Sequence, residues 1–309
     1  MESEKTIQPV LGFSLKAKLA DYAALAKLRL ASLVVYSAGL GYGIALLTAE
    51  VFPLDHKMDY EFSWQTFLYI ILGGFLVTGS SNGFNQVIER ESDAKMSRTE
   101  NRPIPAGRMS VTEGLIVSSI LGIIGLYLLY EINQISFALG LVALVSYVAI
   151  YTPLKKMTPI SVFVGAFPGA FPPMLGWVAA TGSFSVEAGI LFAMQFVWQF
   201  PHFWAIAWKI NDQYSKAGFK MLPFGKKDKR TATIILLSSL ALFAASILPE
   251  YIGFTGRIAT VGLFILSALM VYPAIKLVQT LEDKFALRIM LMSYLYLILS
   301  LTIILIDKV

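Results

Sequence analysis

The sequence predicts an all-α membrane protein that forms a single transmembrane domain over residues 1–309. Three observations predict this class. Hydrophobic residues make up 56% of the chain and charged residues only 15%, a balance that soluble domains seldom reach. The apolar residues form long stretches, each close to the about 20 residues that a helix needs to cross the hydrocarbon core. The charged residues gather between these stretches, in connections too short for a separate soluble domain.

Nine stretches qualify as spans, and all are rich in Leu, Ile, Phe, Val and Ala. They cover residues 28–49, 65–88, 113–131, 135–153, 160–182, 186–209, 232–250, 257–279 and 287–306. The segment before them, 1–27, lacks the apolar core and cleavage site of a signal peptide. Within it, Leu15, Leu19 and Tyr22 share one helical face, as in a short helix along the cytoplasmic membrane interface. A poorly ordered tail is the alternative.

Basic residues are distributed unequally between the two sides of these spans. Of the 25 Lys and Arg residues, only Lys57, Arg257 and Lys308 lie in odd-numbered connections or at the C-terminus. The other 22 precede the first span or lie in the even-numbered connections. Because cytoplasmic loops carry the excess of Lys and Arg, we expect a multi-pass inner-membrane protein with a cytoplasmic N-terminus and an external C-terminus. The basic charge therefore reflects topology and gives no reason to expect a nucleic-acid partner.

The second span runs into a polar motif at its cytoplasmic end. Asn85, Glu89 and Asp93 recur every four residues, so one helix face would present all three over roughly 12 Å. An amide and two carboxylates suit Mg²⁺, which is usually held by one or two carboxylates together with substrate phosphates. Arg98 and Arg102 follow, and guanidinium groups match phosphate geometry. An ordinary solvated loop is the alternative, but it would need no four-residue register.

Two further polar groups are expected on the same side of the membrane. Tyr151 and Lys155 stand four residues apart at the end of the fourth span. The sixth span ends in a cluster that contains Asp212, Lys216 and Lys220. An even number of spans separates this cluster from the first motif, which returns the chain to the same face. Together these groups predict a central cavity that opens to the cytoplasmic side.

The fifth span combines prolines with small residues. Pro168, Pro172 and Pro173 lie within it, together with Gly165 and Gly169. Prolines remove backbone donors and kink helices, whereas glycines permit close helix contact. A kinked wall beside the cavity and plain helix packing are both consistent with this composition.

The sixth span contains the only histidine within a predicted span, His202. It lies roughly 10 Å inside the end of the helix. Ionisable residues at such depth are functional candidates by default, and imidazole is a common ligand of haem iron. Trp198 and Trp204 would offer flat apolar surfaces to a macrocycle. The alternative is a histidine that is hydrogen-bonded between helices in an aromatic belt.

Taken together, these motifs resemble the UbiA superfamily of intramembrane prenyltransferases. The pattern NxxxExxxDxxMxRTxxRPxxxG at residues 85–107 carries the resemblance, with YTPLKK, GAFPGAFPPMLGW, WQFPHFWAIAWK and YSKAGFKMLP further along the chain. These motifs cover spans two to six. The wider pattern is similar to the branch of the superfamily that modifies haem.

The resemblance implies an Mg²⁺-dependent transfer of a farnesyl group from farnesyl diphosphate to the vinyl group of haem B. Water is added, and the products are haem O, used in haem-copper oxidases, and diphosphate. Haem A synthase or cytochrome oxidase assembly proteins are the implied partners, besides membrane lipid. The implied site residues are, for the metal, Asn85, Glu89, Asp93 and Asp212; for diphosphate, Arg98, Arg102, Lys155, Lys216 and Lys220; for catalysis, Asn85, Glu89, Asp93, Tyr151 and Lys155; and for haem, Trp198, His202 and Trp204.

Two positions depart from the usual pattern of the superfamily. Glu89 stands where Asp is common, which lengthens the side chain by one methylene. Gln213 stands where an acid usually precedes the tyrosine, and Asp212 lies one residue earlier. Asp212 is therefore a weaker candidate ligand than Asp93.

Two other functions are alternatives to this one. A prenyltransferase acting on an aromatic quinone precursor would share the metal motifs but would need no axial ligand, so His202 distinguishes the two. An ion-coupled transporter would place its acidic residues near the middle of the membrane. In this sequence the acidic residues gather at one face, which disfavours transport.

Overall fold

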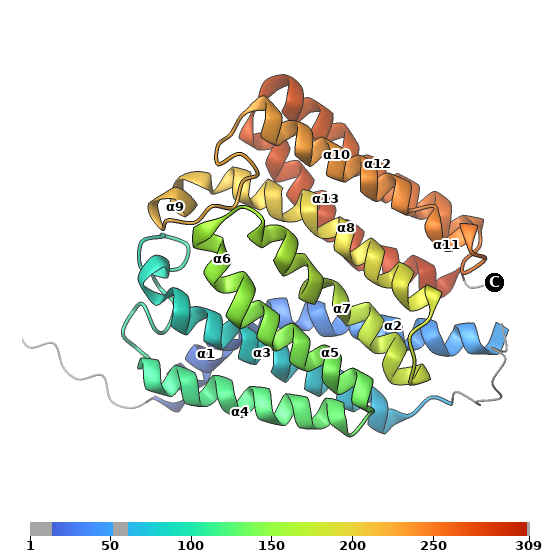
Figure 1. Cartoon of the computed structure of the whole chain (residues 1–309), viewed down its shortest axis with the longest axis horizontal. Coiled ribbons are helices and arrows are strands. Elements are labelled where there is room, and N and C mark those ends of the chain that lie inside the picture. The colour runs from blue at the N-terminus through green and yellow to red at the C-terminus, as the bar shows by residue number, and fades with distance from the viewer. Residues whose placement is uncertain (1–13, 52–60, 308–309) are drawn as a thin grey trace, which may run out of the picture.

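The structure, a computed structural model, describes residues 14–51 and 61–307. Within these ranges the chain is helical, with no β-strand. Nine helical segments of the described chain are long and apolar enough to cross a membrane, which confirms the predicted class. The long helices lie side by side, and the short elements α6 and α9 lie together at one end of the bundle (Figure 1).

The helical elements follow one another along the chain with short connections between them. They are α1 Leu15–Ala26, α2 Leu28–Val51, α3 Trp64–Asp93, α4 Val111–Tyr130, α5 Gln134–Val145, η1 Ser146–Tyr151, α6 Thr152–Met157, α7 Ser161–Thr181, α8 Val186–Lys209, α9 Asn211–Lys216, α10 Lys229–Ala245, α11 Leu248–Tyr251, α12 Arg257–Thr280 and α13 Asp283–Ile306.

Helix α1 confirms that a short helix precedes the first span, and residues 1–13 lie outside the described part. It ends at Lys27, whose backbone takes a left-handed conformation with φ of 51°. Asn82 and Gln86 of α3 donate their side-chain amides to the carbonyls of residues 24–26. These bonds satisfy carbonyls that a helix end leaves without partners. They also hold the junction of α1 and α2 against the polar half of α3.

Helix α3 continues beyond the predicted end of the span at residue 88. It begins after Ser63, whose hydroxyl accepts a hydrogen bond from the backbone of Thr66, and it ends at Asp93. The register that contains Asn85 and Asp93 is therefore helical along its whole length. The polar residues at the end of α3 have their interaction partners within the protein. The helix can therefore continue past the point where its apolar stretch ends.

The fourth span is interrupted by a π-helical turn, η1, between α5 and α6. The backbone amide of Thr152 bonds to the carbonyl of Tyr147, five residues earlier. Pro153 follows directly, and a proline ring clashes with the carbonyl four residues before it in an α-helix. The wider turn relieves this clash, and such turns are frequent at functional sites.

Helices α2 and α7 approach each other closely. A side-chain carbon added at Gly41 would overlap the carbonyl of Pro173, and one added at Gly176 would overlap the carbonyl of Ala38. The prolines of the fifth span lie inside α7. Part of this span therefore serves helix packing.

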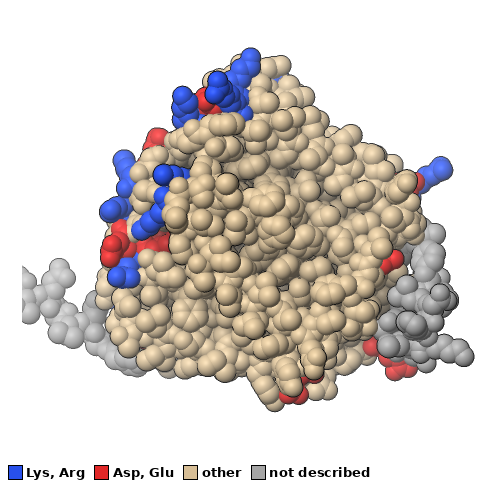
Figure 2. Space-filling model, viewed as in Figure 1, with Lys and Arg blue, Asp and Glu red and all other residues tan. Residues whose placement is uncertain are grey.

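Lysine and arginine side chains in view gather mainly along the side of the molecule where α6 and α9 lie, and uncharged residues cover most of the remaining face (Figure 2). This distribution follows the connections that carry basic residues in the sequence. The chain thus forms a multi-pass membrane protein with most of its basic groups at one end.

Candidate active site

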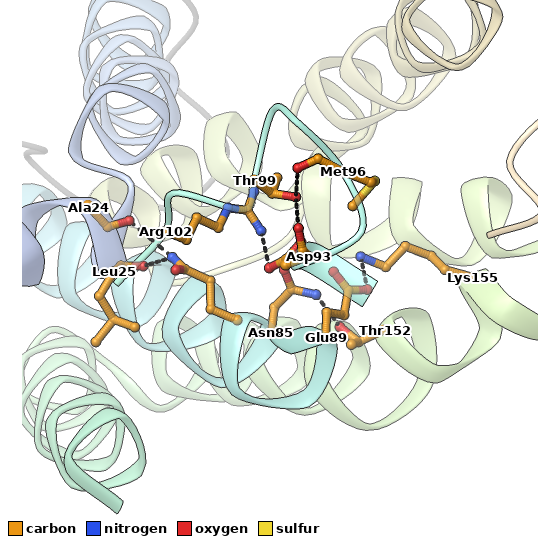
Figure 3. Close-up of polar contacts among 11 residues, drawn as sticks. Ala24, Leu25, Asn85, Glu89, Asp93, Met96, Thr99, Arg102, Thr152 and Lys155 are labelled. Carbon is orange, nitrogen blue, oxygen red and sulfur yellow. Dashed lines mark hydrogen bonds and ion pairs between the residues drawn. The ribbon is translucent and has the colours of Figure 1, made fainter. Parts of the chain in front are cut away.

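The polar face of α3 is buried and carries two ionised pairs. Glu89 is 4% exposed and Asp93 is 1% exposed. Arg102 Nη1 donates to Asp93 Oδ2 at 2.6 Å. Lys155 Nζ forms an ion pair with Glu89 Oε1 (Figure 3). Each acidic residue of the motif therefore has one basic partner, and the two bases come from the following loop and from α6.

The loop after α3 returns to the helix because its own hydrogen bonds fold it back. Thr99 Oγ1 donates to the carbonyl of Asp93 at 2.8 Å, and the amide of Met96 donates to the same carbonyl at 3.2 Å. Gly107 takes a left-handed conformation with φ of 74° before α4 begins. This compact loop brings Arg102 alongside Asp93 (Figure 3).

Asn85 faces the π-helical turn from the same side of α3. Its side-chain amide donates to Thr152 Oγ1 at 3.2 Å, and that hydroxyl donates to the carbonyl of Tyr147 at 2.8 Å. Asn85 is 2% exposed. The three residues of the four-residue register thus share one buried face.

The oxygen atoms of this face suit a divalent cation. Asp93 Oδ1 is buried and has no hydrogen-bond partner among the described residues, whereas Oδ2 is taken by Arg102. Leaving a buried acceptor without a partner costs about 1–3 kcal/mol. Mg²⁺ prefers oxygen donors and keeps several of its waters, so Asn85, Glu89 and Asp93 fit its requirements. No three acidic, histidine or cysteine side chains group together in the described part of the chain, so waters and phosphate oxygens would complete the shell.

The second polar cluster reaches the first through Gln213 and not through Asp212. The backbone amide of Arg98 donates to Gln213 Oε1 at 3.4 Å. Asp212 is exposed on α9 and forms no metal-binding group with Glu89 and Asp93. The geometry therefore gives no support to Asp212 as a metal ligand, and we do not include it in the proposed set.

The predicted diphosphate-binding lysines differ in their placement. Lys155 is 8% exposed, and its Nζ lies 4.9 Å from the ring centroid of Tyr151 and 5.5 Å from that of Phe219. The backbone amide of Lys220 donates to the carbonyl of Lys155 at 2.7 Å. The side chains of Lys216 and Lys220 are exposed, as is that of Arg98. Among these four residues, Lys155 lies inside the site, where it pairs with Glu89.

Lys27 is a residue of this site that the sequence did not single out. Burial, together with the nearby charges of Arg102 and Lys155, lowers the pKa of Lys27 to about 7, and Glu89 and Asp93 oppose the shift. No ion pair holds its ammonium group among the described residues. In the sequence, Lys27 resembles the other basic residues that flank apolar spans and set the membrane topology. Lys27 ends α1 in a left-handed turn, α1 packs on α3, and the charges of Arg102, Lys155, Glu89 and Asp93 act on its ammonium group.

A cavity of about 450 Å³ lies beside the polar site. Its walls come from α2, α3, α5, η1, α7, α8 and α13, and they are mostly apolar. Tyr151 lines it and also contacts Lys155, so the cavity adjoins the buried ion pairs. Pro168 and Pro172 of α7 line it as well, and Pro173 does not. The fifth span is therefore both a cavity wall and a packing surface.

His202 lines the cavity and is held by a hydrogen bond at its Nδ1 atom. Nδ1 lies 2.7 Å from Ser293 Oγ, and that hydroxyl donates its only hydrogen to the carbonyl of Met290 at 2.6 Å. Ser293 must then accept from His202, which places the proton of a neutral imidazole on Nδ1. Nε2 is left with a free lone pair, the state in which imidazole binds a metal. Ser293 was not singled out in the sequence, where nothing distinguishes it from other serines in spans.

The two tryptophans predicted beside His202 lie on different faces of α8. Trp198 precedes His202 by four residues, and its ring stacks on the imidazole with centroids 4.8 Å apart. It lines the cavity, and its Nε1 donates to the carbonyl of Ser293 at 2.8 Å. Trp204 does not line this cavity and packs on Phe200, with centroids 5.3 Å apart. A spacing of two residues turns its side chain to the opposite face of the helix, so the geometry gives no support to Trp204 as a haem contact.

Comparison with known proteins yields a consistent assignment. The model of the UbiA prenyltransferase family matches residues 58–299. A protein of Flavobacterium johnsoniae named protoheme IX farnesyltransferase is 44% identical over 300 residues, which cover 96% of both chains.

Solved structures share the fold at low sequence identity. A structure described for digeranylgeranylglyceryl phosphate synthase has a TM-score of 0.76 at 19% identity and covers 94% of this chain and 98% of that chain. A UbiA homologue from Archaeoglobus fulgidus, solved with GPP and Mg²⁺, has a TM-score of 0.59 at 16% identity and covers 92% of this chain and 99% of that chain. The family match, the near-complete relative and the shared fold agree with the buried motif on α3. The chain belongs to the UbiA prenyltransferase family.

Proposed function

We propose that the chain transfers a farnesyl group from farnesyl diphosphate to the vinyl group of haem B, with addition of water, giving haem O and diphosphate. The observation that carries the proposal is one cavity that contains His202 on one helix and Tyr151 on another. Tyr151 contacts Lys155, which pairs with Glu89, so the cavity links a candidate iron ligand to the ion-pair site. The relative that is 44% identical and named protoheme IX farnesyltransferase supports the same acceptor.

The polar site is suited to the departure of diphosphate. The chemistry that Mg²⁺ supplies, when bound by Asn85, Glu89 and Asp93, is neutralisation of phosphate charge. Arg102 and Lys155 add positive charge that stabilises the leaving group as the bond between farnesyl C1 and oxygen breaks and its electron pair stays with the diphosphate. Positive charge placed where negative charge develops lowers the barrier to ionisation.

The cavity is suited to the second half of the reaction. Tyr147 and Tyr151 line it with ring centroids 5.0 Å apart, and their π faces can stabilise an allylic cation. The terminal carbon of the vinyl group supplies its π electrons to farnesyl C1, which forms the new carbon–carbon bond. The vinyl carbon next to the porphyrin then takes a water molecule and a proton is released. The apolar walls limit earlier capture of the farnesyl cation by water.

We propose that His202 Nε2 ligates the iron of haem B. Ser293 acts as a positioning residue, because its hydrogen bond fixes the tautomer and the ring orientation. His202→Ala should remove or shift the Soret band of purified protein loaded with haem B. Farnesyl diphosphate binding should survive, since the polar site is built on α3 and α6. Trp204→Phe, away from the cavity, is the control and should keep both.

Two results bear on the role of His202. A His202→Ala protein with unchanged Soret band and unchanged turnover would refute ligation of the haem iron by His202. Ser293→Ala should leave the iron ligand present but alter the Soret position, whereas Ser293→Thr should preserve it. A purely structural role for Ser293 would lower stability without moving the band.

Product identity tests the proposed reaction. Membranes that contain the chain should be supplied with haem B or an aromatic quinone precursor, each with farnesyl or geranyl diphosphate. Mass spectrometry should find a product that carries one farnesyl group and one added water, and only with haem B and farnesyl diphosphate. A prenylated quinone precursor in place of haem O would overturn the proposal.

We further propose the cellular setting that the sequence predicted. Residues 1–309 would form one prenyltransferase domain in the inner membrane, with the N-terminus and the mouth of the cavity on the cytoplasmic side and the C-terminus outside. The placement of 22 of the 25 basic residues supports this orientation. Haem A synthase or cytochrome oxidase assembly proteins would be the partners that receive the product.

A further inference from the structure

One charged side chain on the cavity wall has no part in the site described above. Arg29, the second residue of α2, lines the cavity together with His202 and Tyr294. It is the only permanently charged residue among those that line the described cavity. Within the described residues no carboxylate pairs with it. Arg29 is exposed at the start of the first span, so its guanidinium group is accessible to a ligand that enters the cavity.

The partner of Arg29 does not come from the acidic residues of the polar site. Glu89 is paired with Lys155, and Asp93 is paired with Arg102. Arg29 also lies on another wall, because α2 packs on α3, α7 and α13, whereas η1, which carries Tyr151, packs on α3, α5 and α7. A ligand in the cavity can therefore supply the anion that pairs with Arg29.

The depths of Arg29 and His202 define the shape of this ligand. Arg29 lies about 1.5 Å past the start of α2, and His202 lies roughly 10 Å inside the end of α8. These two helix ends belong to the same side of the bundle, because α2 is the first span and α8 the sixth, and an even number of crossings returns the chain to its starting side. A ligand that reaches both residues must be apolar at the depth of His202 and anionic at the level of Arg29. Haem B has this character, since its apolar macrocycle carries two propionates on the edge opposite the vinyl groups.

We propose that Arg29 binds a propionate carboxylate of the porphyrin acceptor and thereby sets which edge of the macrocycle faces the diphosphate site. This inference rests on the proposed function. A guanidinium group binds a carboxylate through two parallel hydrogen bonds, which fixes direction as well as position. With a propionate at Arg29 and the iron at His202, the place of the vinyl edge, which lies opposite the propionates, is fixed within the cavity. Arg29 is then the residue that orients the acceptor.

The test compares haem B with its dimethyl ester, in which both carboxylates are neutral. Dissociation constants for both porphyrins are measured by Soret titration of the full-length protein in detergent, for the wild type and for Arg29→Gln. The wild type should bind the ester about 10-fold more weakly than haem B, which corresponds to about 1.4 kcal/mol. Arg29→Gln should bind both porphyrins equally, at the level of the ester. Arg29→Lys should restore part of the discrimination.

The matched control is Arg288→Gln. Arg288 is an exposed arginine of α13 that does not line the cavity and rests on the ring of Phe285. This variant should discriminate between the two porphyrins as the wild type does. Farnesyl diphosphate binding, measured without haem, should be unchanged in Arg29→Gln, because the diphosphate is assigned to Arg102 and Lys155.

Four outcomes would overturn the inference. An equal preference for haem B over its ester in the wild type and in Arg29→Gln would show that Arg29 does not bind the carboxylate. Loss of farnesyl diphosphate affinity in Arg29→Gln, with discrimination intact, would assign Arg29 to the phosphates. A wild-type protein that shows no Soret band would refute haem B as the acceptor, and this inference with it. Haem binding without discrimination against the ester would refute this inference alone.

Discussion

Asp93 has two carboxylate oxygens in different states. Oδ2 accepts from Arg102, whereas Oδ1 is buried without a partner among the described residues. We expect Asp93→Asn to lower turnover at least about 100-fold, because the variant keeps the volume of the side chain and loses the charge that a metal ligand needs. Initial rates of product formation by mass spectrometry, at saturating Mg²⁺, measure this effect.

The matched control for Asp93→Asn is Glu91→Gln. Glu91 belongs to the same helix, is exposed, and pairs at the surface with Arg90. Its neutralisation should leave the rate within about twofold, since exposed ion pairs contribute little. Equal rates for the wild type and Asp93→Asn would remove the carboxylate from the mechanism.

The lowered pKa of Lys27 predicts that substrate binding is coupled to the uptake of a proton. Its pKa of about 7 makes it mostly neutral at pH 8 in the free protein. A bound diphosphate adds negative charge nearby and raises this pKa, so Lys27 takes up a proton when the substrate binds. Calorimetric titration with farnesyl diphosphate and Mg²⁺ at pH 8, in buffers of different ionisation enthalpy, should detect up to about one proton taken up per ligand.

Two variants separate Lys27 from other sources of proton uptake. Lys27→Arg keeps the charge at every pH and should reduce the uptake at pH 8. Lys18→Arg is the control, because a hydrogen bond to Glu113 raises the pKa of Lys18, which is therefore already protonated at pH 8. Identical uptake in the wild type and Lys27→Arg would place Lys27 outside the diphosphate site.

Among the elements, the contact between α2 and α7 holds two walls of the cavity together. A side-chain carbon at Gly176 would overlap the carbonyl of Ala38, which belongs to the backbone of α2 and cannot rotate away. We expect Gly176→Ala to lower the free energy of unfolding by about 1–3 kcal/mol, the usual cost of overpacking. Thermal unfolding in detergent, followed by tryptophan fluorescence, measures the loss.

Gly189→Ala in α8 is the control for this substitution. No atom lies within 4 Å of the added carbon at Gly189, so the change should be neutral or stabilising by about 0.5–1 kcal/mol. If Gly176→Ala were as stable as Gly189→Ala, the two helices would have room that the structure does not show.

The fourth span, with its π-helical turn, extends further than the sequence predicted. Pro153 is visible in the sequence, and the span was predicted to end there. The structure instead forms a π-helical turn before Pro153 and continues through the proline as an α-helical turn to Met157. That continuation places Lys155 opposite Glu89. A proline indicates a break, and only the packing of α6 on α7 and on the backbone at Lys220 decides how the chain accommodates it.

For the whole molecule, the unequal distribution of basic residues predicts its orientation. A reporter that is active only in the cytoplasm should be active when fused after Lys227 and inactive when fused at Val309, since three spans separate the two points. The fusions are compared at equal abundance, measured by immunoblot. Activity at Val309 together with inactivity after Lys227 would invert the topology and move the proposed site to the other side.

The sequence by itself determined the class of the protein, its nine spans and the helical register of Asn85, Glu89 and Asp93. These features depend on local causes: the thickness of the hydrocarbon sets the length of each apolar stretch, and the period of the helix sets which residues share a face. The motifs of the spans and loops also indicated the family, because each kept its residues at characteristic spacings.

Only the tertiary structure decided which side chains meet. His202 and Ser293 are 91 residues apart in sequence, and Asn85 and Thr152 are 67 apart. The structure brought Gln213 to the polar site in place of Asp212 and turned Trp204 away from the cavity. It also placed Lys27 near the charges of the polar site and Arg29 on the cavity wall. The physical reason is that a helix face is fixed by local periodicity, whereas the partner of that face depends on how separate helices pack. Such contacts between distant residues leave no periodic signal in a single sequence.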